Sequence, residues 1–493
     1  MTRTRFRTTI SLVILCSLSS VSYLAAQEKS AEIDALLKQY LEYSQFNGSV
    51  LIADHGAVIF KKGYGEANME WGIPNAPDTR FRLGSITKQF TATLVLQLVE
   101  EGKLKLDGKI TDYIPDYPKP MGEKITIHNL LTHTSGIPNY TSLPSFQLSL
   151  SRLPANPSEF IKGFWNLPLE FEPGSKFNYS NSGYFLLGVI LETVSGKSYA
   201  RLLEEKIFGP LKMHDSGYDS GTPLLLKRAA GYQKAGGGLV NSEFVDMSTP
   251  FAAGALYSTV EDLFLWDRAL YSDKILSDRS KAVMFQPRIE TGHQPGPLMH
   301  YAYGWFVGKT QVGTSADSIF AISHGGAING FNALIARYPQ DQKLIVLLNN
   351  TGGAPLASVA QGILGILFGK PYAGAVRSLA DVVRESALKS GIEAAVARFK
   401  ELLPRKLEYY LAENEMNVLG YEYLQVGKIP EAIAVFTLNV NAFPQSYNVY
   451  DSLGEAYAAA GNKELAIKNY EKSVELNPKS ESGIEALKKL RGK

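Results

Sequence analysis

Cysteine is almost absent from this chain of 493 residues, which contains a single one, Cys16. That cysteine lies within an N-terminal segment, residues 1–26, which we expect to be removed from the mature protein. A mature chain without thiols has no disulfide, no cysteine nucleophile and no zinc–thiolate site. The sequence therefore excludes these three kinds of site.

A strong charge of either sign is also missing, because the formal net charge is only +2. Arg3, Arg5 and Arg7 lie in the N-terminal segment, so the mature chain would carry a charge of about −1. No basic face argues for nucleic acid, and no acidic tail is present. After residue 26 no apolar run is long enough to predict a transmembrane span.

Residues 1–26 have the order of a secretory signal peptide. Three arginines are followed by an apolar stretch, residues 10–18, and then by Ala25 and Ala26. Leu24 stands where a small residue is usual, which leaves the cleavage position open. An uncleaved membrane anchor is the alternative, but the apolar stretch is short for one. We therefore expect a secreted or periplasmic protein.

The most informative stretch runs from Gly84 into a predicted helix. Apolar residues recur at helical spacing from Phe90 until Gly102 ends the pattern. Ser85 would lie in the first turn, near free backbone N–H groups, and Lys88 would share its face of the helix. A hydroxyl beside an amine forms a nucleophile with its own proton acceptor, provided that the lysine pKa is lowered.

The Ser-x-x-Lys pattern is not specific by itself. A second copy joins Ser386 to Lys389 in a charged helical region that we expect at the surface. The first copy therefore needs support from other parts of the chain.

Polar residues also precede a second apolar helix, predicted from Tyr184 to about Val194. Tyr179, Ser180 and Asn181 follow a Pro173-Gly174 turn, which would place a phenol and an amide on a rigid rim. The alternative is that Ser180 or Asn181 only caps the helix.

His128 and His133 lie five residues apart without an acidic partner at metal-ligand spacing. We therefore predict that both pack inside the protein with their ring nitrogens hydrogen-bonded, and that the chain holds no metal.

Strand patterns occur at both ends of the region from 46 to 349, with helices and long loops between them. The first two strands are predicted at 48–53 and 57–60, and the later ones at 303–307, 318–324, 331–338 and 344–348. This order predicts the α/β (α+β) class, with an antiparallel sheet flanked by helices and an inserted helical subdomain. The cleft between sheet and subdomain is the natural site.

After about residue 370 the composition shifts, and a period of 34 residues emerges. Seven positions from Leu419 to Pro444 are matched from Leu453 to Pro478, including Gly420 with Gly454 and Phe436 with Tyr470. The segment 414–493 resembles tetratricopeptide repeats. Only two units are clear, so we predict that the segment packs on the catalytic domain or on a protein partner. Residues 371–413 are predicted as a helical linker or a degenerate repeat.

Three motifs occur in a fixed order: Ser85-x-x-Lys88, Tyr179-Ser180-Asn181 and His324-Gly325-Gly326. Together with the texts at 131–136 and 303–305 they resemble the serine β-lactamase and penicillin-binding-protein superfamily, in its class C β-lactamase-like branch. That branch also holds D-amino-acid peptidases and secreted esterases. The resemblance covers roughly residues 30–370, which implies a β-lactamase/transpeptidase-like hydrolase domain over 27–370 that needs no cofactor.

The resemblance assigns roles residue by residue. Ser85 would attack a carbonyl and form an acyl-enzyme, and Lys88 or Tyr179 would act as the base. Asn181 would hold Lys88 and the substrate amide. The backbone N–H groups of Ser85 and Ala327 would form the oxyanion hole, while His324, Gly325 and Gly326 would bind substrate.

The third motif departs from the class C pattern, because most true class C β-lactamases have Lys-Thr-Gly there. His324 is only partly charged at neutral pH, which weakens the case for carboxylate-bearing β-lactams. Esters, D-amino-acid amides or peptides fit better. The alternatives are a penicillin-binding D-alanyl-D-alanine carboxypeptidase, or a repeat-mediated interaction protein with an accessory hydrolase.

Overall fold

The computed structural model of the chain describes residues 27–235, 238–292, 298–406, 408–478 and 480–492. The predicted signal peptide lies outside these residues. The chain forms two compact units. The first contains the described residues up to 233 and those of 240–374, and the second contains the described residues of 234–239 and from 375 onward.

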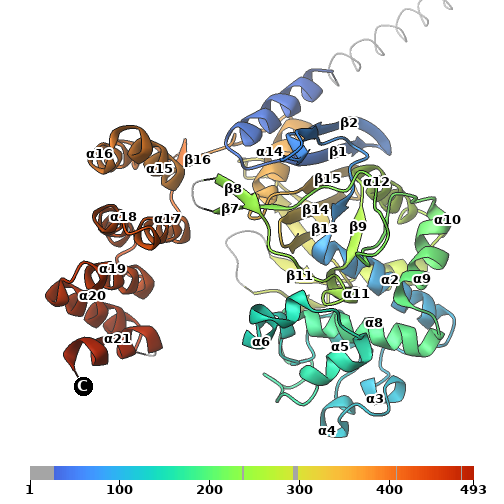
Figure 1. The fold of residues 1–493 in the computed structure, drawn as a ribbon. Helices are drawn as coiled ribbons and strands as arrows, with labels where there is room; N and C mark the ends of the chain where they lie inside the picture. Colours follow the sequence, from blue (N-terminus) through green and yellow to red (C-terminus); the bar gives the residue numbers. More distant parts are fainter. Residues whose placement is uncertain (1–26, 236–237, 293–297, 407, 479, 493) are drawn as a thin grey trace, which may run out of the picture. The chain divides into compact units, whose positions relative to one another are not determined.

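An eight-stranded sheet forms the centre of the first unit (Figure 1). Every neighbouring pair is antiparallel, in the order β10-β11-β12-β13-β14-β15-β1-β2. The strands are β1 (Gly48–Asp54), β2 (Ala57–Tyr64), β10 (Ile289–Glu290), β11 (Met299–Tyr301), β12 (Phe306–Gln311), β13 (Ser318–Ile328), β14 (Phe331–Tyr338) and β15 (Lys343–Asn349). Pairing of β1 with β15 confirms that both ends of the region build one sheet.

The strand predicted at 303–307 begins only at Phe306, so its first three residues were assigned wrongly. Gly304 has a φ of +77°, and a Cβ atom there would lie 2.8 Å from the carbonyl oxygen of Lys88. A left-handed turn that only glycine fits therefore replaces the start of the strand. The same turn places residues 303–305 against the helix that carries Lys88.

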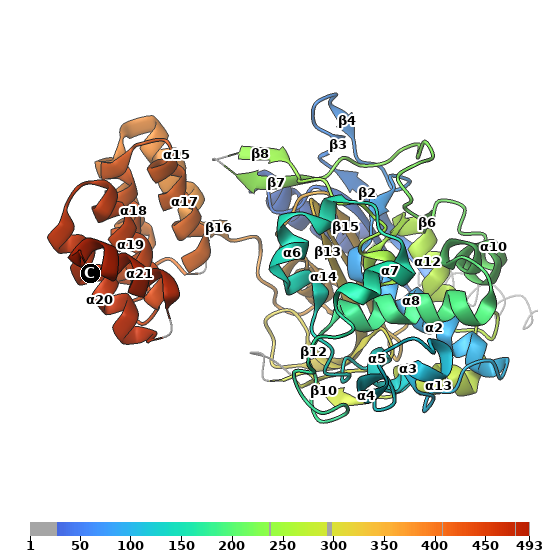
Figure 2. The same cartoon turned by 60° about the horizontal axis from the view of Figure 1, so that its bottom comes forward.

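The helical subdomain, α3 to α8, lies below the sheet in Figure 1 and comes forward in Figure 2. Its longest helix, α8 (Asn181–Ser195), packs against α2 (Thr87–Glu100) and α11 (Phe251–Gly254). Both long helices bury their apolar positions in one core that also includes side chains from the sheet. The other helices of the unit are the helix over 27–42, η1 (Gly84–Ile86), α3 (Ile110–Tyr113), α4 (Lys119–Gly122), α5 (Ile127–Leu131), η2 (Tyr140–Ser142), α6 (Pro144–Leu148), η3 (Leu150–Arg152), α7 (Pro157–Phe160), η4 (Ile161–Gly163), α9 (Tyr199–Leu203), η5 (Glu204–Phe208), α10 (Gly209–Leu211), α12 (Val260–Ala269), α13 (Asp278–Phe285) and α14 (Leu356–Phe368).

Short strands complete the list. They are β3 (Glu66–Asn68), β4 (Ile73–Pro74), β5 (Phe81–Arg82), β6 (Gly217–Tyr218), β7 (Tyr232–Ala235), β8 (Gly238–Asn241), β9 (Leu256–Ser258), β16 (Arg377–Ser378) and β17 (Tyr409–Tyr410). Of these, β5 pairs with β9 and leads directly into the turn that carries Ser85.

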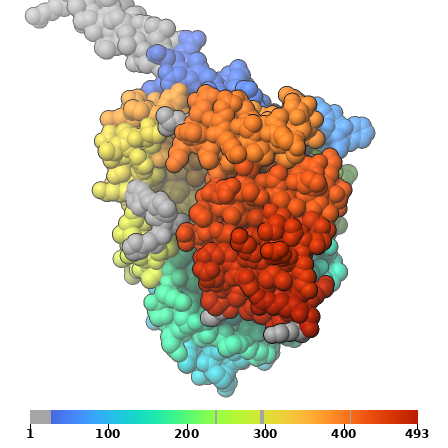
Figure 3. Space-filling view, turned by 90° about the vertical axis from the view of Figure 1, so that its left-hand side faces the viewer, coloured from blue at the N-terminus to red at the C-terminus, as the bar shows by residue number. Residues whose placement is uncertain are grey.

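The second unit is built from successive helices, α15 (Leu379–Ser390), α16 (Ile392–Leu402), α17 (Glu413–Gln425), α18 (Ile429–Ala442), α19 (Tyr447–Ala459), α20 (Lys463–Leu476) and α21 (Glu481–Arg491). Its colour passes from orange to dark red in chain order in Figure 3, so neighbouring pairs stack. A Cβ atom on Gly420 would lie 2.4 Å from the ring of Phe436, and Gly454 meets Tyr470 in the same way. In both helix pairs, an aromatic ring therefore fills the space beside a glycine where the two helices cross. This packing confirms the predicted repeat.

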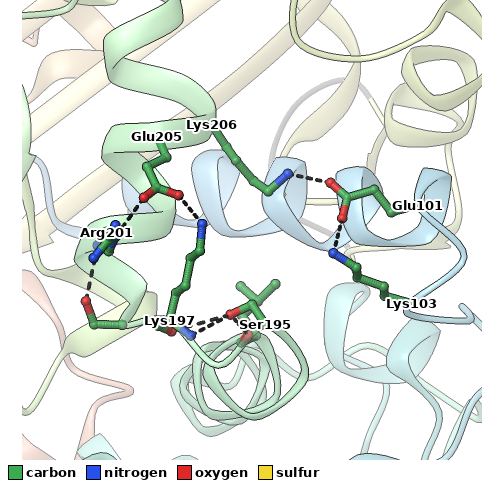
Figure 4. A network of polar contacts seen from close by, with 9 residues as sticks. Glu101, Lys103, Ser195, Lys197, Arg201, Glu205 and Lys206 are labelled. Atoms are coloured by element: carbon green, nitrogen blue, oxygen red, sulfur yellow. Dashed lines mark hydrogen bonds and ion pairs between the residues drawn. The ribbon is translucent and has the colours of Figure 1, made fainter.

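Exposed charges on the first unit form a network at one end of α2 (Figure 4). Glu101 binds Lys103 and Lys206, and Glu205 binds Lys197 and Arg201. Exposed pairs of this kind stabilise a fold by less than about 1 kcal/mol each. Within the described residues, no helix is both long and apolar enough to cross a bilayer.

Candidate active site

Ser85 lies in η1, a single 3₁₀ turn that leads directly into α2. The preceding Gly84 has a φ of +53°, and a Cβ atom there would lie 2.8 Å from the backbone nitrogen of Ala327. Only glycine fits this close approach, so the turn is held against β13. The Ser85 hydroxyl oxygen lies 3.1 Å from Nζ of Lys88. The predicted pairing of these two side chains is therefore present.

Lys88 is completely buried, with 0% of its surface exposed. Its Nζ also lies 2.9 Å from Oδ1 of Asn181 and 2.8 Å from the carbonyl oxygen of Ala253. Burial without a carboxylate partner lowers the pKa of Lys88 well below its usual value. Burial at this position therefore favours the neutral form of the amine.

Tyr179 lies beside Lys88, whose Nζ is 4.9 Å from the centre of the phenol ring. The phenol hydroxyl is buried and has no hydrogen bond of ordinary geometry to any described residue. Burial raises the pKa of Tyr179, and the nearby Ser85 hydroxyl opposes this rise. The phenol is therefore protonated at neutral pH.

Asn181 is the first residue of α8, and both ends of its amide are held. Its Oδ1 accepts from Lys88, while its Nδ2 donates to Thr141 Oγ1 at 3.2 Å. Its backbone N–H donates to Asn139 Oδ1 at 3.1 Å. Ser180 occupies the cap position, but its hydroxyl donates to the carbonyl of Ile137 rather than accepting from the helix. The alternative that Ser180 serves as the side-chain cap is therefore wrong.

His324 lies in β13, within 6.3 Å of Tyr179 between ring centres. Its Nδ1 is 2.6 Å from the carbonyl oxygen of Gly325, which can only accept, so Nδ1 carries a hydrogen. Its Nε2 is 3.0 Å from the hydroxyl of Tyr301. Burial and the nearby Lys88 lower the pKa of His324 to about 3. The sequence analysis predicted a partly charged imidazole, whereas burial in the structure keeps His324 neutral at neutral pH.

Gly326 and Ala327 continue β13 beyond its pairing with β12, which ends at Ser323. A Cβ atom on Gly326 would lie 1.9 Å from the carbonyl oxygen of Leu83 and 3.2 Å from the nitrogen of Ser85. The backbones of η1 and β13 are therefore in direct contact. The two N–H groups predicted for the oxyanion hole, those of Ser85 and Ala327, come from these adjoining segments.

The two histidines of the 125–136 region differ in their surroundings. His128 has the expected partner, since its Nδ1 lies 2.7 Å from the Tyr303 hydroxyl. His133 accepts from the backbone N–H of Ser180 at 3.1 Å, but its buried Nε2 has no partner among the described residues. The prediction of hydrogen-bonded imidazoles is therefore confirmed for Nδ1 of His128 and for Nδ1 of His133, and it is wrong for Nε2 of His133.

The residues predicted from the three motifs adjoin one site. Sequence reasoning missed four groups that hold them: the carbonyl of Ala253, the side chains of Asn139 and Thr141, and the hydroxyl of Tyr301. Only Tyr301 could have been found from the sequence, because it stands two residues before the Tyr303-Gly304-Trp305 motif. Among the residues that the structure describes, no group of three His, Cys, Asp or Glu side chains could hold a metal ion.

Comparison with known families matches residues 33–368 to the Beta-lactamase family and residues 447–480 to the tetratricopeptide repeat. Penicillin-binding protein 4* of Bacillus subtilis (strain 168) is 30% identical over 366 residues, which span 70% of this chain and 78% of that protein.

Two solved structures are similar to the first unit. The octameric penicillin-binding protein homologue from Pyrococcus abyssi has a TM-score of 0.60 at 29% identity, covering 69% of this chain and 78% of its own. The D-amino acid amidase from Ochrobactrum anthropi SV3 has a TM-score of 0.60 at 25% identity, covering 69% and 99%. With the motifs and the buried Ser85–Lys88 pair, these matches show that the chain belongs to the β-lactamase family of serine hydrolases and carries a tetratricopeptide repeat in its C-terminal unit.

Proposed function

We propose that this protein is a secreted hydrolase that cleaves esters and D-amino-acid amides or peptides through an acyl-enzyme on Ser85. The observation that carries the proposal is the arrangement around Lys88. A neutral amine has two hydrogens and one lone pair. Asn181 Oδ1 and the Ala253 carbonyl can only accept, so they take both hydrogens. The lone pair is then left for the third neighbour, the hydroxyl of Ser85.

This arrangement makes Lys88 the base of the first step. Ser85 Oγ attacks the carbonyl carbon of the substrate while its proton passes to Lys88 Nζ. The N–H groups of Ser85 and Ala327 stabilise the negative oxygen of the tetrahedral intermediate, an effect for which each donor is typically worth about 2.7–4 kcal/mol. The intermediate collapses, and the leaving group departs with a proton.

Tyr179 is the proposed donor of that proton, because burial raises its pKa and keeps the phenol protonated, and because its hydroxyl lies near that of Ser85. Lys88 restores the phenol by passing on the proton taken from Ser85. In the second step water attacks the acyl carbon and gives its proton to the same pair. The carboxylic acid is released, and Ser85 recovers its hydroxyl.

Because His324 is neutral, the site favours substrates that present no carboxylate group next to β13. Both of its ring nitrogens have protein partners, and none of the ion pairs formed by the described residues includes it. In our proposal His324 shapes the site, while Gly325 and Gly326 bring the strand backbone to the substrate. The similarity to a D-amino acid amidase supports the same substrate class.

A D-alanyl-D-alanine carboxypeptidase that binds penicillin is the second candidate. The 30% identity to a penicillin-binding protein favours it. Labelling with a fluorescent penicillin and slow release of the label would support this candidate, whereas rapid turnover of neutral esters without labelling would argue against it.

In either case we expect the repeat unit to bind a protein partner.

The experiment that tests the proposal is hydrolysis of p-nitrophenyl esters by the Ser85→Ala variant. Ser386→Ala is the matched control, since Ser386 begins the second Ser-x-x-Lys pattern, in α15, where Lys389 is exposed. We expect Ser85→Ala to abolish hydrolysis and Ser386→Ala to keep the wild-type rate. Full activity of Ser85→Ala would remove Ser85 from the mechanism.

A further inference from the structure

His133 holds the backbone on both sides of Tyr179. Its carbonyl oxygen accepts from the N–H of Asn178 at 2.9 Å, and its Nδ1 accepts from the N–H of Ser180 at 3.1 Å. Its ring also lies against the Tyr179 ring, with 4.1 Å between centres and 31° between planes. One residue thus fixes the residue before Tyr179, the residue after it, and the phenol ring itself.

The hydrogen bond from Ser180 determines the form of the imidazole. A backbone N–H can only donate, so Nδ1 of His133 carries no hydrogen, and the single hydrogen of a neutral ring lies on Nε2. The ring is buried among the rings of Tyr301 and Tyr184, with centres 4.6 Å and 5.1 Å away. His133 is therefore neutral, and it adds no positive charge beside Lys88.

The backbone of His133 is held in an uncommon conformation. Its φ is +58°, in the left-handed region that residues other than glycine rarely adopt. The turn is fixed by hydrogen bonds from Thr134 N to the Asn129 carbonyl at 2.9 Å and from Gly174 N to the Thr134 carbonyl at 2.7 Å. Such conformations persist where the surroundings enforce them, and they cluster at functional sites.

We propose that His133 is the positioning residue for Tyr179, holding the phenol in the orientation that faces Ser85 and Lys88. The inference rests on the proposed function, in which Tyr179 transfers a proton. Neither the Tyr179 hydroxyl nor His133 Nε2 has a hydrogen-bond partner among the described residues. The ring of His133 is the nearest of the rings that pack on Tyr179, with 4.1 Å between centres against 6.3 Å for those of Tyr301 and His324. His133 also accepts the backbone hydrogen bonds from the residues on both sides of Tyr179, so it contributes most to the orientation of the phenol.

Two variants separate the contacts. His133→Asn keeps an acceptor at the position of Nδ1 and tolerates a left-handed backbone, but it removes the ring. His133→Phe keeps a ring but removes the acceptor. His128→Asn is the matched control, because His128 lies five residues earlier and bonds to Tyr303 instead.

The readout is steady-state hydrolysis of a p-nitrophenyl ester by the full chain, together with the thermal unfolding midpoint. We expect each His133 variant to lower kcat by about 10- to 100-fold with KM within about twofold, since a small misplacement of a catalytic group can cost 10²-fold. We expect His128→Asn to keep kcat within about twofold. A kcat for His133→Asn within about twofold of wild type would overturn the proposal.

A double-mutant cycle with Tyr179→Phe separates this proposal from the proposed function. If His133 acts through Tyr179, His133→Asn lowers kcat no further in the Tyr179→Phe background. Equal losses in both backgrounds would show that His133 has only a general structural role and would refute the inference. An unchanged kcat in Tyr179→Phe alone would instead refute the role proposed for Tyr179.

Discussion

Replacing Lys88 by methionine tests the neutral amine directly. Methionine has a similar length and removes the lone pair that faces Ser85. Loss of a general base typically lowers the rate by about 10²–10⁴-fold, which corresponds to about 3–5 kcal/mol in the barrier. Acylation of Ser85, measured as the burst of p-nitrophenol in rapid mixing, should slow by this factor.

The same variant should change how stability depends on pH. The pKa of Lys88 is well below 10.5 in the folded protein, so the unfolded chain binds an extra proton between the folded and unfolded pKa values. Wild-type stability therefore rises with pH in this window, by about 1.4 kcal/mol per pH unit from this group. The Lys88→Met variant lacks this contribution.

Urea unfolding of both proteins at several pH values between neutral and 10 gives the comparison. We expect the free energy of unfolding of wild type, relative to the variant, to increase as the pH is raised. A stability difference that stays constant with pH would refute the reasoning, since a lysine that is charged in the folded state is not a base. A burst rate of the Lys88→Met variant within tenfold of wild type would refute it as well.

Further predictions concern the contact between β13 and η1 and the stability of the first unit. Gly326→Ala should lower kcat by at least about 10²-fold in the ester assay, because its Cβ atom would lie 1.9 Å from a carbonyl oxygen, and a kcat equal to that of wild type would contradict the close contact. Asp267→Asn should lower the free energy of unfolding by about 3–5 kcal/mol, because it breaks a buried ion pair with Arg337. Glu205→Gln, in the exposed network of Figure 4, should lower the free energy of unfolding in urea by less than about 1 kcal/mol. Equal losses in Asp267→Asn and Glu205→Gln would contradict the role of burial.

The sequence predicted the sheet well because its strands carry strong local patterns. Residues 50–53 and 344–348 are apolar throughout, and both are covered on two faces in the structure. The paired strands at 331–338 and 344–348 were also bounded by a turn with glutamine and proline. The first error at 303–305 arose because the bulky Tyr303 and Trp305 favour strand, whereas the close contact with α2 requires a turn at Gly304.

The candidate site was predicted only as far as its motifs extend. Ser85, Lys88, Tyr179 and Asn181 were found because their motifs occur in an order that resembles the family, whereas the spacing of each motif alone was not specific. The carbonyl of Ala253 could not be found, since a backbone acceptor leaves no trace in residue type. The lowered pKa of Lys88 was predicted, but the neutral state of His324 was not, because burial, rather than sequence neighbours, sets it.

His133 illustrates the same limit at the level of a single side chain. Sequence spacing argued only against a metal, and a packing role was the expectation. The contacts that give it a further role join residues 133, 178 and 180, which are brought together by the turn at 132–136.

Mass spectrometry of the intact protein after exposure to p-nitrophenyl esters, D-amino-acid amides and penicillins tests the central claim most directly. Our account predicts an adduct with the mass of the acyl group, carried on the peptide that contains Ser85 and absent from Ser85→Ala. An adduct on another residue, or turnover of these substrates by Ser85→Ala at the wild-type rate, would contradict it.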